Sequence, residues 1–209
     1  QNLLIVADGM GGHRAGDYAS RLCVETMVQS LEKSAHKTPV SLFEEAVTAA
    51  NKAVFEESAS HVEYEGMGTT VVACTLEENT LYIANIGDSR LYLIRDGIEQ
   101  ITDDHSLVEE MVKQGNITES EARIHPQKNI ITRALGINEE VLADFFEIDV
   151  EQGDVIMLCS DGLSNMIEDE DMEYIVKNSD TLQTAAESLV ARANENGGND
   201  NITVVLAEV

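Results

Sequence analysis

The sequence is poor in basic residues, in long apolar runs and in cysteine, and each shortage argues against a class of protein. It has 13 Lys and Arg against 39 Asp and Glu, which gives a formal net charge of −26. Because nucleic-acid phosphates are bound mainly by Lys and Arg, this balance argues against a nucleic-acid-binding protein. No apolar run approaches the ~20 residues of a membrane span. The opening stretch, with four apolar residues from Leu3 to Val6, also lacks the basic region and cleavage site of a signal peptide.

Cysteine is also scarce. The three cysteines are Cys23, Cys74 and Cys159. Few, odd in number and set in apolar stretches, they predict reduced thiols and a cytoplasmic protein. A cysteine-dependent phosphatase needs an arginine six residues after its nucleophile, and those positions hold Gln29, Thr80 and Asn165. No phosphate-binding loop of the G-x-x-x-x-G-K-[ST] type is present, and the five histidines lack zinc-site spacing.

Length and pattern predict one mixed domain. The 209 residues contain only two prolines, no repeat and no linker. Strand-like and helical runs come in separate groups, which favours an α+β fold with mainly antiparallel sheets and helices outside. The three runs 69–76, 80–86 and 90–94 predict an antiparallel meander. Further strands are expected at 3–7, 144–148, 154–159 and 202–207, and helices at 17–31, 41–60, 106–114, 118–124, 168–177 and 181–195.

Four aspartates stand at the ends of these expected strands: Asp8, Asp88, Asp161 and Asp200. For any single Asp-Gly pair, turn chemistry is a sufficient explanation. Several glycines beside Asp8 and Asp200 would, however, let the backbone approach a small ligand closely. Clustered carboxylates repel one another, and Mg²⁺ or Mn²⁺ relieves that repulsion. Two such ions ~3.5–4 Å apart can hold a phosphoryl oxygen and activate a water.

Seven sequence motifs occur in a fixed order along the chain. In order they are VADGMGGHRAGDYAS, GMGTTVVA, ANIGDSRLYLIRDG, QITDDHSLVEEMVKQGNIT, HPQKNIITRALG, LCSDGLSNMI and GGNDNITVVL. Over essentially all 209 residues, the chain resembles bacterial metal-dependent serine/threonine protein phosphatases of type 2C. The resemblance implies a four-layer α/β/β/α sandwich of two mainly antiparallel sheets flanked by helix pairs. It also implies hydrolysis of phosphoserine and phosphothreonine by a metal-bridging hydroxide, opposing bacterial Ser/Thr kinases.

The resemblance assigns roles to particular residues. Asp8 would bridge two core ions, Mn²⁺ or Mg²⁺, and Gly9 would offer a backbone carbonyl to one of them. Asp161 and Asp200 would be the remaining protein ligands of the other ion. Asp88, with Asp161, matches the acidic pair that holds a third, weaker ion.

Two further residues carry open alternatives. His13 would protonate the leaving alkoxide, or it is an ordinary histidine on a loop surface. The segment of about 104–138 corresponds to a mobile flap beside the site. Arg133 at its end would contact substrate, or it is a plain surface arginine.

One family feature is not in the sequence given. Relatives carry an upstream strand with a phosphate-gripping arginine and an Asn-Glu-Asp metal ligand, and this sequence starts after that point, at Gln1. From the strand-end aspartates and the ordered motifs, the main hypothesis is a cytoplasmic, monomeric phosphatase acting on phosphorylated proteins. The alternative is a truncated or non-catalytic member that binds metal or phosphoprotein as a regulatory module. A calcium-binding structural domain fits the acidity, but the EF-hand spacing is absent.

Overall fold

The structure, a computed structural model, describes residues 2–35 and 38–209, without the side chain of His13. Within these residues the strands form two four-stranded sheets and one short two-stranded sheet, and every pairing between strands is antiparallel. The first sheet has the order β1 (Leu3–Val6), β4 (Val71–Glu77), β5 (Thr80–Ile86), β8 (Asp144–Asp149). The second has the order β10 (Val204–Glu208), β9 (Val155–Cys159), β6 (Arg90–Ile94), β7 (Ile98–Gln100). The short sheet pairs β2 (Gly9–Met10) with β3 (Gly68–Thr69).

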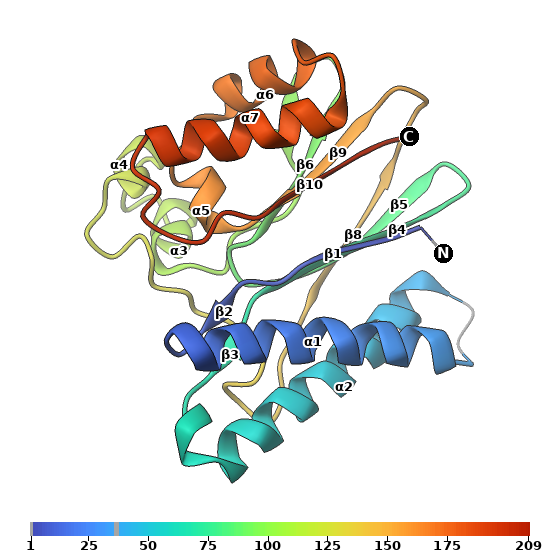
Figure 1. Cartoon of the computed structure of the whole chain (residues 1–209), viewed down its shortest axis with the longest axis vertical. Helices are drawn as coiled ribbons and strands as arrows, with labels where there is room; N and C mark the ends of the chain where they lie inside the picture. The colour runs from blue at the N-terminus through green and yellow to red at the C-terminus, as the bar shows by residue number, and fades with distance from the viewer. Residues whose placement is uncertain (1, 36–37) are drawn as a thin grey trace.

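The two main sheets pack face to face, and each carries helices on its outer face (Figure 1). The first sheet is covered by α1 (His13–Lys33) and α2 (Pro39–Ser60). The second is covered by α6 (Asp169–Lys177) and α7 (Leu182–Glu195). This is the expected four-layer α/β/β/α sandwich. The remaining helical pieces are α3 (Leu107–Lys113), α4 (Glu119–Arg123), α5 (Asp161–Ser164) and the 3₁₀ turn Val62–Tyr64.

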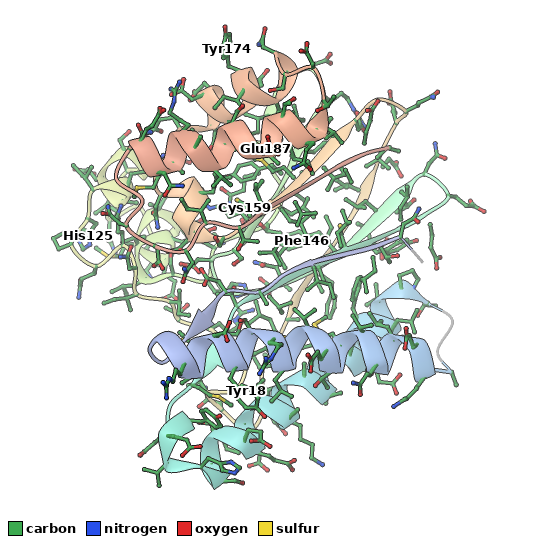
Figure 2. The ribbon with its side chains drawn as sticks, viewed as in Figure 1. Tyr18, His125, Phe146, Cys159, Tyr174 and Glu187 are labelled. Carbon is green, nitrogen blue, oxygen red and sulfur yellow. The ribbon has the colours of Figure 1, made fainter. Side chains whose placement is uncertain are left out.

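Each interface between layers has its own apolar core. The sheets meet through side chains such as Cys74, Ile83 and Leu158, all at most 1% exposed. Figure 2 shows Phe146 among these side chains, whereas Tyr174 of α6 points outward. Because strands such as β5 are covered on both faces, their sequences are nearly continuous apolar runs. Burying each such side chain contributes ~1.5–3 kcal/mol.

The expected three-stranded meander is wrong in its last strand. β4 and β5 do form a hairpin, from Glu77 paired with Thr80. The chain then leaves the first sheet at Gly87, whose φ of +103° only glycine adopts readily, and β6 pairs with β9 in the second sheet. Adjacent strands predict a hairpin by default, and only long-range pairing reveals the change of sheet. Asp88 consequently lies at the crossing between the two sheets.

Helix starts differ from expectation in two places. α1 begins at His13 rather than at residue 17, so Gly16 is helical and its backbone packs against Gly9. α2 begins at Pro39 after Thr38 rather than at residue 41, because proline at the first helical position is favourable. The capping box at the start of α4, between Thr118 and Glu121, is present.

Between β7 and β8 the chain forms no strand of either main sheet; it carries α3, α4 and irregular segments over residues 101–143. This stretch contains the segment expected to be a flap. In residues 2–35 and 38–209, no helix has both the length and the apolar character needed to cross a bilayer.

Candidate metal centre

The four strand-end aspartates lie at one edge of the sandwich because of strand direction. β1 and β5 both run antiparallel to β4, so they end at the same edge, and Asp8 and Asp88 follow there. In the second sheet, Cys159 at the end of β9 pairs with Arg90 at the start of β6 and with Val204 at the start of β10. Asp161 follows that end of β9 as the first residue of α5, and Asp200 lies in the loop before β10.

Burial and mutual repulsion shift the ionisation of these carboxyls. Burial, together with the charges of Asp161, Asp200 and Asp88, raises the pKa of Asp8. Burial and the charge of Asp200 likewise raise the pKa of Asp161. Burial, with the charges of Asp161 and Asp104, raises the pKa of Asp88 to about 7. The structure thus brings all four predicted aspartates into one electrostatic group.

Side chains around Asp161 tie its strand to the Asp200 loop. The Asn165 side chain donates a hydrogen bond to Asp161 Oδ2 at 3.0 Å. Ser160, which is 1% exposed, donates from Oγ to the carbonyl oxygen of Asn201 at 3.1 Å and accepts from the Thr203 N–H at 3.0 Å. The ends of β9 and the start of β10 are therefore fixed relative to each other. Sequence reasoning did not single out these residues, because nothing in their spacing marks the long-range contact.

Gly9 lies where the site requires close backbone contact. A Cβ added to Gly9 would lie 1.8 Å from the carbonyl oxygen of Gly16 in the first turn of α1. Glycine is therefore required by packing at this position, whether or not its carbonyl binds an ion. The consequence for the site is that Asp8 and the first turn of α1 are held close together.

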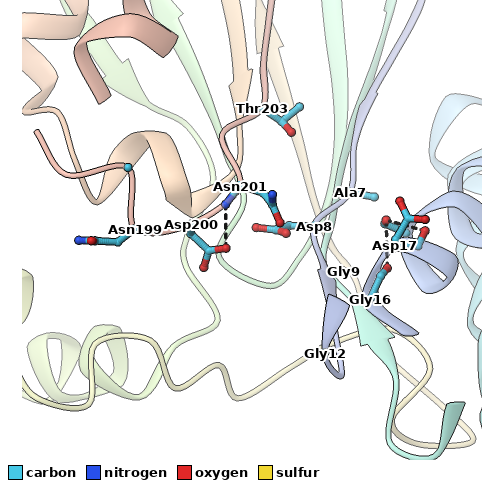
Figure 3. A pocket seen from close by; sticks show the side chains of 12 residues that line it. Ala7, Asp8, Gly9, Gly12, Gly16, Asp17, Asn199, Asp200, Asn201 and Thr203 are labelled. Carbon is cyan, nitrogen blue, oxygen red and sulfur yellow. Dashed lines mark hydrogen bonds between the residues drawn. The ribbon is translucent and has the colours of Figure 1, made fainter. Parts of the chain in front are cut away.

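A cavity of about 650 Å³ opens between the Asp8 strand end and the Asp200 loop, lined by Asp8, Gly9, Gly12 and Asp200 among others. Figure 3 shows the Asp8 and Asp200 side chains facing each other across Asn201, with Asp17 on the other side of the strand. The Asn201 N–H donates to Asp200 Oδ1 at 2.8 Å and orients that carboxylate.

A second cavity of about 590 Å³ lies between the expected flap and the second sheet. Asp88 and Asp161 line it, and so do Ser106, Lys128 and Asp169. Arg90 lies beside Asp88 in this cavity, but its guanidinium is held by Asp104 through contacts of 2.7–3.2 Å. Arg90 therefore neutralises Asp104 first, and the carboxylates of Asp88 and Asp161 have no such close arginine partner among the described hydrogen bonds.

Two predicted residues have different outcomes. The backbone of His13 begins α1, and its side chain lies outside the described residues, so its role stays a prediction. Arg133 donates to Asp144 Oδ1 at 2.7 Å and to the Leu142 carbonyl oxygen at 3.0 Å, and it lines neither cavity. These contacts account for its charge structurally, and its contact with substrate also stays a prediction.

The donor set suits a hard divalent cation. Carboxylates, a backbone carbonyl and glycine-lined space are what Mg²⁺ and Mn²⁺ prefer, and crowding that raises carboxyl pKa values is relieved by bound cations. Across the described part of the chain, no three His, Cys, Asp or Glu side chains stand as a ready-made cage. Ions held here would accordingly keep several water ligands, as Mg²⁺ commonly does.

The sandwich and its acidic centre together define a class of protein whose candidate divalent-cation site lies at one edge of two packed antiparallel sheets. A family model described as Protein phosphatase 2C matches residues 1–207. The Serine/threonine phosphatase stp of Listeria monocytogenes serotype 4b (strain F2365) is 41% identical over 213 residues, covering 100% of this chain and 84% of that protein.

Solved structures of serine/threonine phosphatases have the same fold. The serine/threonine phosphatase PstP/Ppp of Mycobacterium tuberculosis superposes with a TM-score of 0.92 at 38% identity, covering 100% of this chain and 88% of that chain. A PstP catalytic domain in complex with two manganese ions gives a TM-score of 0.89 at 36% identity, over 99% of this chain and 87% of that one. The chain belongs to the protein phosphatase 2C family and is a serine/threonine phosphatase, a hydrolase.

Proposed function

We propose that this phosphatase hydrolyses phosphoserine and phosphothreonine in proteins with two divalent cations held by Asp8, Gly9, Asp161 and Asp200, and a third held by Asp88 with Asp161. The observation that carries the proposal is the shared electrostatic group of four aspartates, of which Asp8, Asp88 and Asp161 are partly buried and Asp200 is exposed. The PstP relative in complex with two manganese ions supports a centre that holds two divalent cations. When bound, such ions supply Lewis-acid chemistry that lowers the pKa of water and neutralises phosphoryl charge.

The residues of the chain then have distinct tasks. Asp8 would contact both core ions, since its carboxylate faces Asp161 and Asp200. The Asn201 N–H and the Asn165 side chain hold the Asp200 and Asp161 carboxylates in place. His13 would donate a proton to the leaving serine or threonine oxygen. That role predicts a loss for His13→Ala on a phosphothreonine peptide, but little loss on p-nitrophenyl phosphate, whose leaving group needs no proton.

The cellular setting is part of the proposal. Substrates would be phosphoproteins made by Ser/Thr kinases, which this enzyme counteracts as a cytoplasmic monomer. The three cysteines are all free and buried, as suits a reducing compartment.

The test is hydrolysis of a phosphothreonine peptide with Mn²⁺, with EDTA, and with Asp161→Asn. We expect EDTA to abolish turnover. We expect Asp161→Asn to reduce kcat/KM by about 100-fold or more, the scale on which loss of one charge-stabilising group is felt. Asp171→Asn is the matched control, because Asp171 is an exposed aspartate near the start of α6.

Two results would contradict the proposal in different ways. Turnover indifferent to both the chelator and Asp161→Asn would remove the metal mechanism. Calorimetric Mn²⁺ binding without turnover above buffer would instead favour the alternative, a regulatory module that binds metal or phosphoprotein.

A further inference from the structure

Thr70 holds both main-chain polar groups of Asp8. Its Oγ1 accepts a hydrogen bond from the Asp8 N–H at 3.0 Å, and its own N–H donates to the Asp8 carbonyl oxygen at 2.8 Å. The preceding Thr69 adds a hydroxyl donor to the same carbonyl at 3.0 Å. Thr70 is 4% exposed, so solvent does not replace these bonds if they are lost. The backbone position of Asp8 is therefore set by the two residues at the junction of β3 and β4.

The same side chain also reaches the turn that carries Asp88. Thr70 Oγ1 lies 2.7 Å from the hydroxyl oxygen of Ser89, which is 1% exposed. A Cβ on Gly87 would lie 2.6 Å from the Thr70 methyl carbon, so this methyl group packs directly on the turn. Thr70 thus contacts the Asp88 turn with both branches of its side chain. A continuous hydrogen-bonded path runs from the Asp8 N–H through two buried hydroxyls to the residue after Asp88.

The Asp88 turn is clamped on its other side. The Gly87 N–H donates to His105 Nδ1 at 3.0 Å, and the His105 N–H donates to the Gly87 carbonyl oxygen at 2.9 Å. With Gly87 fixed by His105 and Ser89 fixed by Thr70, the backbone on either side of Asp88 is held. The remaining freedom of Asp88 lies in its side chain.

We propose that Thr70 and Ser89 are positioning residues that set the spacing between Asp8 in the first sheet and Asp88 at the crossing to the second. Neither hydroxyl needs to touch an ion, since both act through the backbones that carry the carboxylates. Outer-shell partners of this kind typically affect metal affinity by about 10- to 100-fold. The inference rests on the proposed metal centre, and it adds the residues that hold that centre in register across the two sheets.

The chain supplies a matched control in Thr102. Its Oγ1 accepts the Leu91 N–H at 3.0 Å, the same length as the Thr70 bond to Asp8, and it is 2% exposed. Thr102→Val therefore removes an equally buried hydroxyl with an equivalent backbone bond, but one that does not lie between Asp8 and Asp88. Any general cost of losing a buried threonine hydroxyl appears in both variants.

The experiment is isothermal titration calorimetry of the whole chain with MnCl₂, checked for folding by circular dichroism. We expect Thr70→Val to weaken Mn²⁺ binding by about 10- to 100-fold. Thr70→Ser, which keeps the hydroxyl, should stay within about threefold of wild type, and Thr102→Val within about twofold. Ser89→Ala removes the partner hydroxyl and should weaken binding in the same direction. Adding it to Thr70→Val should have little further effect, because the two hydroxyls act as one link.

Several outcomes would overturn the inference. One is Thr70→Val, or Ser89→Ala if Thr70→Val does not fold, binding Mn²⁺ as tightly as wild type. Another is a loss in Thr102→Val equal to that in Thr70→Val, which would show a merely structural effect. Absence of Mn²⁺ binding by the wild type would remove the metal centre itself, and the inference with it. The wild-type titration therefore separates failure of the proposed function from failure of the inference alone.

Discussion

The raised pKa of Asp88 predicts how the stability of the metal-free protein depends on pH. Burial and neighbouring carboxylates raise this pKa from 3.8 to about 7 in the folded chain. A carboxyl whose folded pKa is raised favours the folded state while it is protonated. Its contribution is complete below the unfolded pKa and is lost as pH rises through about 7. In EDTA, the protein should therefore be more stable at pH 5.5 than at pH 8, and Asp88→Asn should weaken this dependence.

The size of the effect follows from the same values. A rise from 3.8 to about 7 corresponds in full to about 4 kcal/mol, since each pKa unit is worth ~1.4 kcal/mol. Roughly half of this is lost below pH 5.5, so the part lost between pH 5.5 and 8 is about 2 kcal/mol. The free energy of unfolding of Asp88→Asn should accordingly fall by about 2 kcal/mol less than that of wild type over this interval.

The assay is urea unfolding in EDTA at the two pH values. The chain has no tryptophan, so circular dichroism is the suitable probe. With a slope of ~2–3 kcal/mol/M, a difference of about 2 kcal/mol moves the midpoint by roughly 0.7–1 M. Asp180→Asn is the control, because Asp180 is exposed and its variant should follow wild type with pH. If wild type and Asp88→Asn lose stability in parallel between pH 5.5 and 8, the account of the Asp88 environment is wrong.

Three other predictions concern packing, the flap and the thiols. Gly9→Ala should destabilise the protein by about 1–3 kcal/mol or more in urea unfolding and impair turnover, because the new methyl would overlap the Gly16 carbonyl. Arg123 of α4 donates to the Ser164 carbonyl oxygen at 3.4 Å and pairs with Glu168 at 3.0 Å. Arg123→Ala should therefore speed thermolysin cleavage within residues 114–131 by about fivefold. Arg192→Ala, which removes an ion pair within α7, should not change this rate. Burial raises the pKa of all three cysteine thiols to about 12, so native protein should resist a thiol reagent at pH 8 and react fully once unfolded.

Local pattern was a good guide to individual elements. The strands expected at 80–86 and 90–94 have those bounds in the structure, since runs of β-branched and aromatic residues between turn residues define them locally. The α4 capping box was equally readable, because all of its contacts lie within four residues. The assignment of β6 to the second sheet was not, because it depends on pairing with β9 more than sixty residues later.

The site shows the same division. Asp8, Asp88, Asp161 and Asp200 could be found because each aspartate marks the end of an apolar run beside turn residues. Thr70 could not, because a threonine at the start of a strand is ordinary sequence, and its significance comes from contacts with Asp8 and Ser89, 62 and 19 residues away. The GTT of the GMGTTVVA motif is the one local signal that would have directed attention to it.

The chemistry of the link between Asp8 and Asp88 fits the repulsion that it must withstand. The charge of Asp88 contributes to the raised pKa of Asp8, so the two carboxylates repel each other when both are ionised and no cation is bound. A lysine or arginine bridge would hold the ends together, but its charge would compete with the cations for the same carboxylates. Two neutral hydroxyls acting on the backbone avoid that competition and leave the carboxylate oxygens free. The same reasoning explains why Arg90, the nearby cation, is directed to Asp104, where it can stabilise the fold without occupying the proposed metal ligands.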